Sequence, residues 1–371
     1  MKSRPSDLDD HTLHQALQAW NITATSLTHA PVGFGDHHWT ATDQHTRRWF
    51  ITVADLTAKP HCGPTPATAW HGLHQAMTTA ATLPLDFIAA PVPTPDGDTL
   101  RRLGTRYALS VFPFLDGTAG HFGDPVNRPD RTAILTLLAH LHRTKPPATT
   151  PICPPALPSR ATLTAALTTL HTPWTGGPFA EPARALTAQH ATHLHHRLTE
   201  FDRRTATPHG TLVITHGEPH PGNLMRLENR HILLDWDTVG LAVPERDLWL
   251  VAQDDADLAH YTEISGRPVD RSTLELYRLR WALDDLSAFL HWFRSPHTRT
   301  ADTEQAWTGF TETLSALTGT PGKATALEGI MATATTATTA AGDAITVSAT
   351  AATDAVVTDP DPIATDPTAA P

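Results

Sequence analysis

Residues 211–241, TLVITHGEPHPGNLMRLENRHILLDWDTVGL, interrupt a region of helical patterns with short strand-like ones. Apolar runs such as LVIT and HILL, separated by Gly, Pro and Asn, are typical of short strands joined by tight turns. The first turn, THGEPHPGNLM at residues 215–225, holds two histidines, a carboxylate and an amide. We therefore expect a hairpin set into a helical body, with a polar turn at its edge.

The segments on either side of this hairpin differ in pattern. Residues 21–56 suggest a three-stranded meander around the turn GFGD, residues 67–83 have helical spacing, and 87–93, 100–107 and 108–115 are further strand candidates. After residue 116 the patterns are helical, as in RTAILTLLAHLHRT and RSTLELYRLRWALDDLSAFLHWFR. These patterns predict a sheet lobe at 1–115, a helical lobe at 116–318, and a disordered Ala/Thr/Pro-rich tail at 319–371.

Composition excludes several classes of protein. The formal net charge of -11, without a basic stripe, argues against a nucleic-acid partner. The chain has no apolar stretch long enough to span a bilayer, and its two cysteines, Cys62 and Cys153, cannot form a disulfide framework. We therefore expect a cytoplasmic protein without a membrane or an obligate protein partner, and assign no function to the cysteines.

Three oxygen-bearing side chains of the hairpin indicate its chemistry. Glu218 precedes Asn223 by five residues, and Asp235 follows the apolar strand HILL. Two carboxylates and an amide oxygen at one strand edge suit Mg2+ and a hydroxyl group to be deprotonated. Phosphoryl transfer needs such a set, because the metal neutralises phosphate oxygens while a carboxylate positions the attacking hydroxyl.

The motif HGEPHPGNLM, followed by ILLDWDTVGLAVPERDLW, resembles the aminoglycoside phosphotransferase family. The resemblance implies an α+β, protein-kinase-like fold of two lobes, with an antiparallel sheet and a larger helical part. It implies that Glu218 is the catalytic base and that Asn223 and Asp235 are the Mg2+ ligands. Asp247 would be a buried acid that steadies the loop. Asp237 fits either a site residue or a simple acidic turn.

Weaker parts of the resemblance concern the nucleotide. Gly33, Phe34 and Gly35 fall where a glycine-rich loop would cover the phosphates, although a plain hairpin turn explains them equally well. In VFPFLDG, backbone groups near Phe112 and Phe114 would meet the base of ATP or GTP.

A late helix carries the expected acceptor site. By the same resemblance its adjacent acids, Asp284 and Asp285, would face a cationic substrate. Without the resemblance, an acidic pair on a helix indicates a solvated face.

The sequence departs from the family pattern in two places. Glu218 stands where an aspartate is usual, and Thr52 stands where the family has its phosphate-binding lysine. The helical segment 67–83 contains no glutamate to pair with such a lysine. Lys59, Arg47 or Arg48 could reach the phosphates instead, or could be surface charges.

These observations leave two functions open. The first is transfer of the terminal phosphoryl group of ATP or GTP to a hydroxyl of a small molecule, with an aminoglycoside-type antibiotic or a related amino sugar as the expected acceptor. The second is a catalytically weak or inactive kinase-like binding protein that sequesters a ligand or senses nucleotide. Zinc is disfavoured, because Pro219 and Pro221 prevent the helix that would align His216 with His220. In the family reading both histidines are structural residues of the loop.

Overall fold

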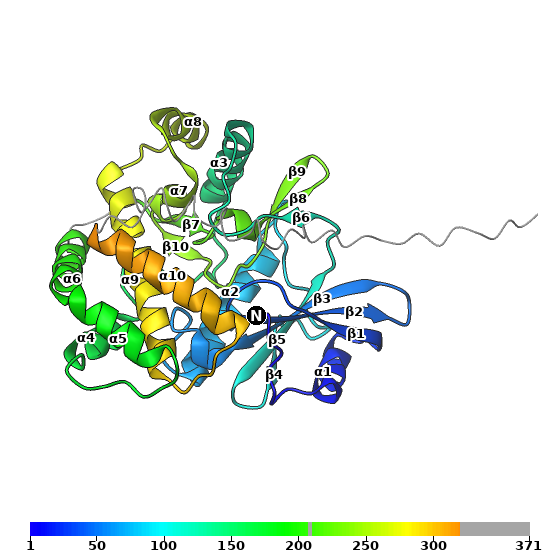
Figure 1. Ribbon diagram of the computed structural model, residues 1–371. Coiled ribbons are helices and arrows are strands. Elements are labelled where there is room, and N and C mark those ends of the chain that lie inside the picture. The colour runs from blue at the N-terminus through cyan, green and yellow to red at the C-terminus, as the bar shows by residue number, and fades with distance from the viewer. Residues whose placement is uncertain (207–209, 320–371) are drawn as a thin grey trace, which may run out of the picture.

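The computed structural model describes residues 1–206 and 210–319, and it has a sheet lobe and a helical lobe (Figure 1). The amino-terminal lobe is an antiparallel sheet in the order β1-β2-β3-β5-β4. Its elements are α1 (Asp10–Leu17), η1 (Gln18–Trp20), β1 (Ala24–Ala30), β2 (His37–Asp43), β3 (Arg48–Asp55), η2 (Leu56–Ala58), α2 (Pro66–Thr82), β4 (Arg101–Leu103) and β5 (Tyr107–Pro113). This arrangement confirms the meander and the helix expected from the sequence.

Strand β3 divides its side chains between two environments. Ile51 and Val53 are fully buried on the face that packs toward α1, while Thr52 between them points to the opposite face. Thr52 lies opposite His38 of β2 and Ser110 of β5. These three polar residues therefore share the face of the sheet turned away from the α1 core.

The expected strand at 87–93 is not a strand of this sheet. Its backbone bonds to both lobes: Ala89 N lies 2.9 Å from O of Leu233 in the helical lobe, next to the bridge Ile88–Leu233, and Val92 N lies 2.7 Å from Val111 O of β5. Pro91 and Pro93 lack the N–H groups that a longer ladder would need. The segment therefore connects the two lobes.

The helical lobe contains eight helices of the described chain and two small sheets, with strand orders β6-β8-β9 and β10-β7. Its elements are β6 (Thr118–Ala119), α3 (Arg128–Arg143), α4 (Arg160–Thr168), α5 (Ala180–Gln189), α6 (Ala191–Thr205), β7 (Val213–Thr215), η3 (Pro221–Asn223), β8 (Leu224–Leu227), β9 (Arg230–Leu233), β10 (Gly240–Ala242), α7 (Glu245–Val251), α8 (Asp255–Ser265), α9 (Arg271–Arg294) and α10 (Ala301–Thr318). The expected hairpin is therefore present, as β8 and β9.

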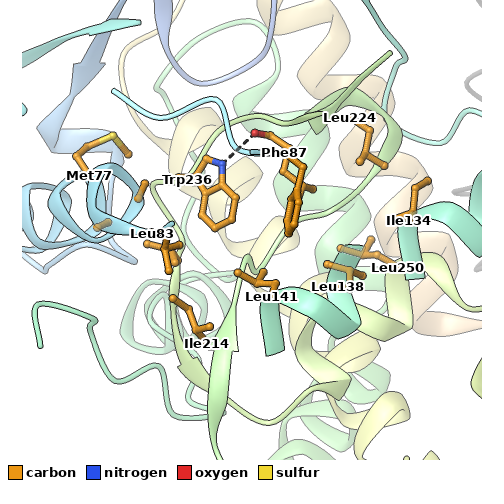
Figure 2. Packing of buried hydrophobic residues seen from close by; sticks show 14 of the residues in the cluster. Met77, Leu83, Phe87, Ile134, Leu138, Leu141, Ile214, Leu224, Trp236 and Leu250 are labelled. Carbon is orange, nitrogen blue, oxygen red and sulfur yellow. Dashed lines mark hydrogen bonds between the residues drawn. The ribbon is translucent and has the colours of Figure 1, made fainter. Parts of the chain in front are cut away.

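One hydrophobic core joins α2 to the helical lobe. Met77 of α2 belongs to the same cluster as Leu138 of α3, Ile214 of β7 and Trp236 (Figure 2). The Trp236 ring is fully buried, and its Nε1 donates to Leu233 O at 2.9 Å. Burial of one such side chain contributes roughly 1.5–3 kcal/mol. The core therefore fixes the turn that carries the acids on either side of Trp236.

Helix α10 ends at Thr318, where Gly319 caps it with a φ of 63°. Apart from Gly319, the predicted tail lies outside the described residues. Within the described chain, no helix combines the length and apolar character needed to cross a membrane.

Candidate active site

The loop at residues 215–225 connects β7 to β8, and the ring of His216 holds its start. Nε2 of His216 lies 2.7 Å from Leu234 O, and Nδ1 lies 3.2 Å from the backbone N of Glu218. Because the carbonyl can only accept, the ring proton is assigned to Nε2, and Nδ1 accepts from Glu218. His216 therefore joins the loop to the strand end just before Asp235.

Asp247 of α7 binds backbone N–H groups of the same loop. It is fully buried, and its carboxylate lies 2.8 Å from the backbone N of His216 and 2.6 Å from that of Gly217. Nε2 of His142 lies 3.0 Å from the same carboxylate. Burial acts to raise the pKa of Asp247, but the hydrogen bond and charge of His142 outweigh it and lower that pKa. The expected role of Asp247 as a buried acid that steadies the loop is confirmed.

Glu218, Asn223 and Asp235 come together at one edge of the small sheets. Asn223 Nδ2 donates to Glu218 O at 3.1 Å, and Leu234 N donates to Asn223 O at 2.8 Å. Asp235 follows with a φ of 57°, a left-handed conformation that costs a non-glycine residue roughly 1–3 kcal/mol. These bonds, together with the effect of the Glu218 charge on Asp235, place the three residues next to one another at this edge.

The carboxylates of this edge are crowded. Loss of hydration, followed by the negative charge of Asp237, raises the pKa of Glu218. The same two causes raise the pKa of Asp235, and because Asp235 is solvent-exposed, we regard the crowding of negative charge as the more important one. A bound cation would relieve this repulsion.

The donor atoms fit Mg2+. Because the amide nitrogen of Asn223 is bonded to Glu218 O, its Oδ1 is the atom left for a metal, beside the Asp235 carboxylate. Both are hard oxygen donors of the kind that Mg2+ prefers. The described residues contain no group of three or more His, Cys, Asp or Glu side chains arranged to hold a metal. A magnesium ion at this edge would therefore need phosphate oxygens and water for its remaining ligands.

A buried lysine lies beside these acids. Nζ of Lys59 is 2.5 Å from Asp237 Oδ2 and 2.9 Å from Asp36 Oδ2, and Lys59 is only 7% exposed. Nε2 of His61 lies 3.1 Å from the same Asp237 oxygen. Although burial opposes it, the charges of Lys59 and His61 hold the pKa of Asp237 below its usual range. Lys59 is therefore not a surface charge. Asp237 holds the Lys59 ammonium group next to the other acids of the site.

The position of the usual phosphate-binding lysine is polar but uncharged. Thr52 Oγ1 lies 3.2 Å from Nδ1 of His38, whose ring stacks on Phe50 with centroids 5.1 Å apart. Burial lowers the pKa of His38 to about 3, so this ring is neutral. Thr52 and the neutral His38 therefore supply no positive charge in place of the lysine.

The turn with Gly33, Phe34 and Gly35 extends toward the helical lobe. The two glycines have φ values of 70° and 106°, a region that favours glycine. The ring of Phe34 lies 5.8 Å from that of Trp292 in α9. The turn therefore contacts the helical lobe through Phe34.

The backbone at the end of β5, near Phe112 and Phe114, is partly bonded within the protein. Phe114 N donates to Arg48 O at 3.3 Å, and the Arg48 guanidinium lies 3.5 Å from the centre of the Phe114 ring. Pro113 has no N–H, and Phe112 lies opposite Phe50 in the sheet. The N–H of Phe114 is therefore already used within the protein, and Pro113 has none to offer.

The two adjacent acids of α9 have different surroundings. Asp284 lies 3.2 Å from Arg280 Nη2 and also accepts from Ser159. Loss of hydration, followed by the charges of Glu218 and Asp284, raises the pKa of Asp285 to about 7. Asp285 is thus the member of the pair that senses the catalytic loop.

Aromatic rings lie next to Asp285. Trp281, one turn before it in α9, stacks on Phe122 with centroids 5.7 Å apart, and His220 of the loop meets Phe122 edge-on at 5.0 Å. Nδ1 of His220 accepts from Gly222 N at 3.1 Å, and burial lowers the pKa of His220 to about 3. His216 and His220 both serve the loop, as the family reading expects.

The sequence indicates Lys59 only as one of three candidate cations for the phosphates, and it does not indicate Asp36 or His61. Lys59 follows Thr52 by seven residues, which shows that it can reach the site but not that it does. Asp36 and His61 have no signal in the sequence, because only the folded chain brings the glycine turn and the segment after η2 to Asp237.

The sequence and the fold match known proteins. Residues 32–289 match the sequence profile described as the phosphotransferase enzyme family. No curated protein sequence matches the chain.

Among solved structures, spectinomycin phosphotransferase in complex with ADP and spectinomycin is 14% identical, with 83% of this chain and 95% of that chain covered and a TM-score of 0.61. The AMP-bound complex of that enzyme is 14% identical, covering 85% and 100% of the two chains with a TM-score of 0.59. Ethanolamine kinase of Plasmodium vivax is 12% identical, covering 78% and 82% with a TM-score of 0.50. These structures establish the kinase-like fold.

Proposed function

The chain belongs to the phosphotransferase enzyme family, and from this premise we propose that it transfers the terminal phosphoryl group of ATP or GTP to a hydroxyl of a cationic small molecule. An aminoglycoside-type antibiotic or a related amino sugar is the acceptor that we propose. The observation that carries the proposal is the meeting of Glu218, Asn223 and Asp235 at one edge of the small sheets.

The proposed reaction assigns a role to each of these residues. Asn223 Oδ1 and the Asp235 carboxylate would hold Mg2+, which when bound neutralises charge on the phosphate oxygens. The Glu218 carboxylate accepts the proton of the acceptor hydroxyl as its oxygen bonds to the terminal phosphorus. The bond from phosphorus to the bridging oxygen breaks, and ADP or GDP leaves. Most of the rate enhancement comes from positioning and electrostatics.

The surroundings of Glu218 support a cationic acceptor. Asp285 senses the charge of Glu218 and, among the described residues, has no lysine, arginine or histidine paired with it. Trp281 and Phe122 provide partly exposed aromatic faces next to it. A carboxylate beside aromatic rings is a favourable environment for an ammonium group. We therefore propose that Asp285, rather than Asp284, contacts an amino group of the acceptor.

Thr52 favours the alternative, a kinase-like protein that binds nucleotide or sequesters a ligand without efficient transfer. The usual lysine is absent there, and α2 carries no glutamate. The retained oxygen groups support transfer instead, because a cluster of like charges is costly in a protein that does not bind a cation.

The test is Mg2+-dependent release of ADP or GDP across a panel of aminoglycosides and other amino alcohols. Wild-type protein is compared with Glu218→Gln and with Glu263→Gln, an exposed glutamate of α8 that serves as the matched control. We expect release that depends on an acceptor, falls by about a hundredfold or more in Glu218→Gln, and is unchanged in Glu263→Gln. Nucleotide binding without release for any acceptor would support the alternative.

A further inference from the structure

We propose that Lys59 supplies, at the nucleotide phosphates, the positive charge that Thr52 cannot supply from β3. The inference rests on the proposed function, because it concerns the nucleotide of that reaction. It assigns a positioning role to a side chain that enters the site from the segment after η2.

The contacts of the ammonium group leave it able to bind a phosphate. Its Nζ bonds to Asp237 at 2.5 Å and to Asp36 at 2.9 Å. A lysine ammonium has three N–H donors, so one donor remains. Oδ1 of Asp36 is buried without a hydrogen-bond partner among the described residues, so the carboxylate is not held by other donors. Among the described residues the third N–H therefore has no partner, and we assign it to a phosphate oxygen while Lys59 keeps its two anchors.

The charge of Lys59 acts on residues of both lobes. Its charge acts on Asp235 and Glu218 of the helical lobe. It also acts on His38, the neighbour of Thr52. The charge of Lys59 therefore acts both on the expected metal ligand and on the residue beside Thr52.

Three arginines near the site contact other groups of the protein. Nε of Arg47 lies 2.8 Å from Asp43, and Arg48 packs on Phe114. Arg246 donates to Thr215 Oγ1 and to a backbone carbonyl beneath the loop, both at 2.7 Å. Of these four cations, Lys59 is the one paired with Asp36 and Asp237, and His61 joins it at Asp237.

The segment that carries Lys59 is held by close packing on α2. Cys62 N and Gly63 N both donate to Lys59 O, at 3.0 and 3.2 Å. A Cβ on Gly72 of α2 would lie 2.0 Å from Cys62 O, so only glycine permits this approach. In place of an ion pair between β3 and a helix glutamate, backbone packing on α2 and the Asp36 and Asp237 carboxylates orient the lysine.

A purely structural ion pair between the lobes is the competing explanation, and the two predict different nucleotide affinities. A lysine on the phosphates discriminates ADP from AMP, because AMP lacks the outer phosphate. A structural ion pair affects both nucleotides alike. The ratio of the two dissociation constants therefore separates the explanations without requiring turnover.

The experiment measures Kd for Mg·ADP and for AMP by calorimetry with wild-type protein, Lys59→Met, and Lys145→Met as the control at an exposed lysine. We expect wild type to prefer ADP, and Lys59→Met to lose about tenfold or more of ADP affinity while AMP affinity changes by less than about threefold. Lys145→Met keeps both affinities. Adding Thr52→Lys to Lys59→Met is expected to restore part of the ADP preference. An unchanged ratio in folded Lys59→Met, or no ADP preference in wild type, overturns the proposal.

A second measurement keeps Lys59 intact, so it does not depend on the folding of a Lys59 variant. The other lysines are Lys2, Lys145 and Lys323, so the side-chain 15N resonance of Lys59 can be assigned by elimination, with each of those three replaced by Arg in turn. We expect this resonance to shift with Mg·ADP much more than with AMP. Equal or absent shifts contradict a phosphate contact. Acceptor-dependent release tests the proposed function separately, and can fail while the ADP preference and the shift are both observed.

Discussion

The side chains of His142 and Asp247 are both fully buried, with Nε2 of His142 3.0 Å from Oδ2 of Asp247. The same carboxylate accepts the backbone N–H groups of His216 and Gly217. A charge taken out of water is stable only when several donors surround it. Helices α3 and α7 therefore set the position of the catalytic loop through one carboxylate.

Replacing Asp247 with Asn tests this anchor. The amide would turn an N–H group toward one of the donors that now face oxygen, leaving buried groups unpaired. We expect a loss of about 2–4 kcal/mol in the free energy of unfolding, measured with urea. Asp96→Asn, at an exposed turn, is the control and should change stability by less than about 0.5 kcal/mol. A loss in Asp247→Asn no larger than in the control would mean that the carboxylate does not hold the loop.

Gly217 is expected to tolerate no side chain. Its φ is 104°, and a Cβ would lie 2.4 Å from Arg246 Nη2 and 2.6 Å from Thr238 Oγ1. Gly97 is a matched control, because its φ is 92° but a Cβ there meets nothing within 4 Å. Gly97→Ala should cost about 1 kcal/mol for the backbone alone, and Gly217→Ala at least about 1–2 kcal/mol more. Equal losses in the two variants, measured by denaturant unfolding, would show that the loop can move to admit the methyl group.

Replacing Asp284 or Asp285 with Asn should change the free energy of unfolding at pH 8 in opposite directions. Asp285→Asn removes a carboxyl whose pKa is raised to about 7. A raised pKa means that, between the unfolded value near 4 and about 7, the folded protein holds the extra proton, so stability falls as pH rises. The variant should therefore be more stable than wild type at pH 8, by about 1–2 kcal/mol because the residue is partly exposed, and the gain should vanish near pH 4.

Asp284→Asn serves as the comparison. It loses the ion pair with Arg280, so we expect lower stability at pH 8, measured by urea unfolding at both pH values. On the proposed function, Asp285→Asn should also raise the KM for a cationic acceptor about tenfold or more, while Asp284→Asn leaves it nearly unchanged. If Asp284→Asn raised the KM more than Asp285→Asn does, Asp284 would be the residue that contacts the acceptor.

The sequence predicted the parts of this protein that depend on local pattern. The meander, the hairpin and the convergence of Glu218, Asn223 and Asp235 follow from alternation and from short spacing in the chain. The division between Asp284 and Asp285 could not be predicted, because it depends on Ser159 and Arg280 lying beside one acid and Glu218 beside the other.

Contacts between segments far apart in the chain could not be predicted either, because they also depend on the folded arrangement. Asp36, Lys59 and Asp237 meet only when the glycine turn, the segment after η2 and the end of β9 are placed together by the fold. In residues 87–93 the apolar pattern suggested a sheet strand, but two prolines and a pairing partner in the other lobe decided otherwise. Pattern records which face is apolar, and does not record which distant segment covers it.

Gly72→Ala tests how the Lys59 segment is held. In a helix interior, alanine normally stabilises relative to glycine by about 1 kcal/mol. Here the added Cβ would lie 2.0 Å from Cys62 O, a backbone atom, so the segment must move away from α2. We therefore expect lower stability and weaker binding of Mg·ADP, with AMP binding nearly unchanged, as measured by urea unfolding and calorimetry. His71→Ala, at an exposed position of the same helix, controls for helix propensity and should leave both affinities intact. A more stable Gly72→Ala with the ADP preference of wild type would show that α2 does not orient Lys59.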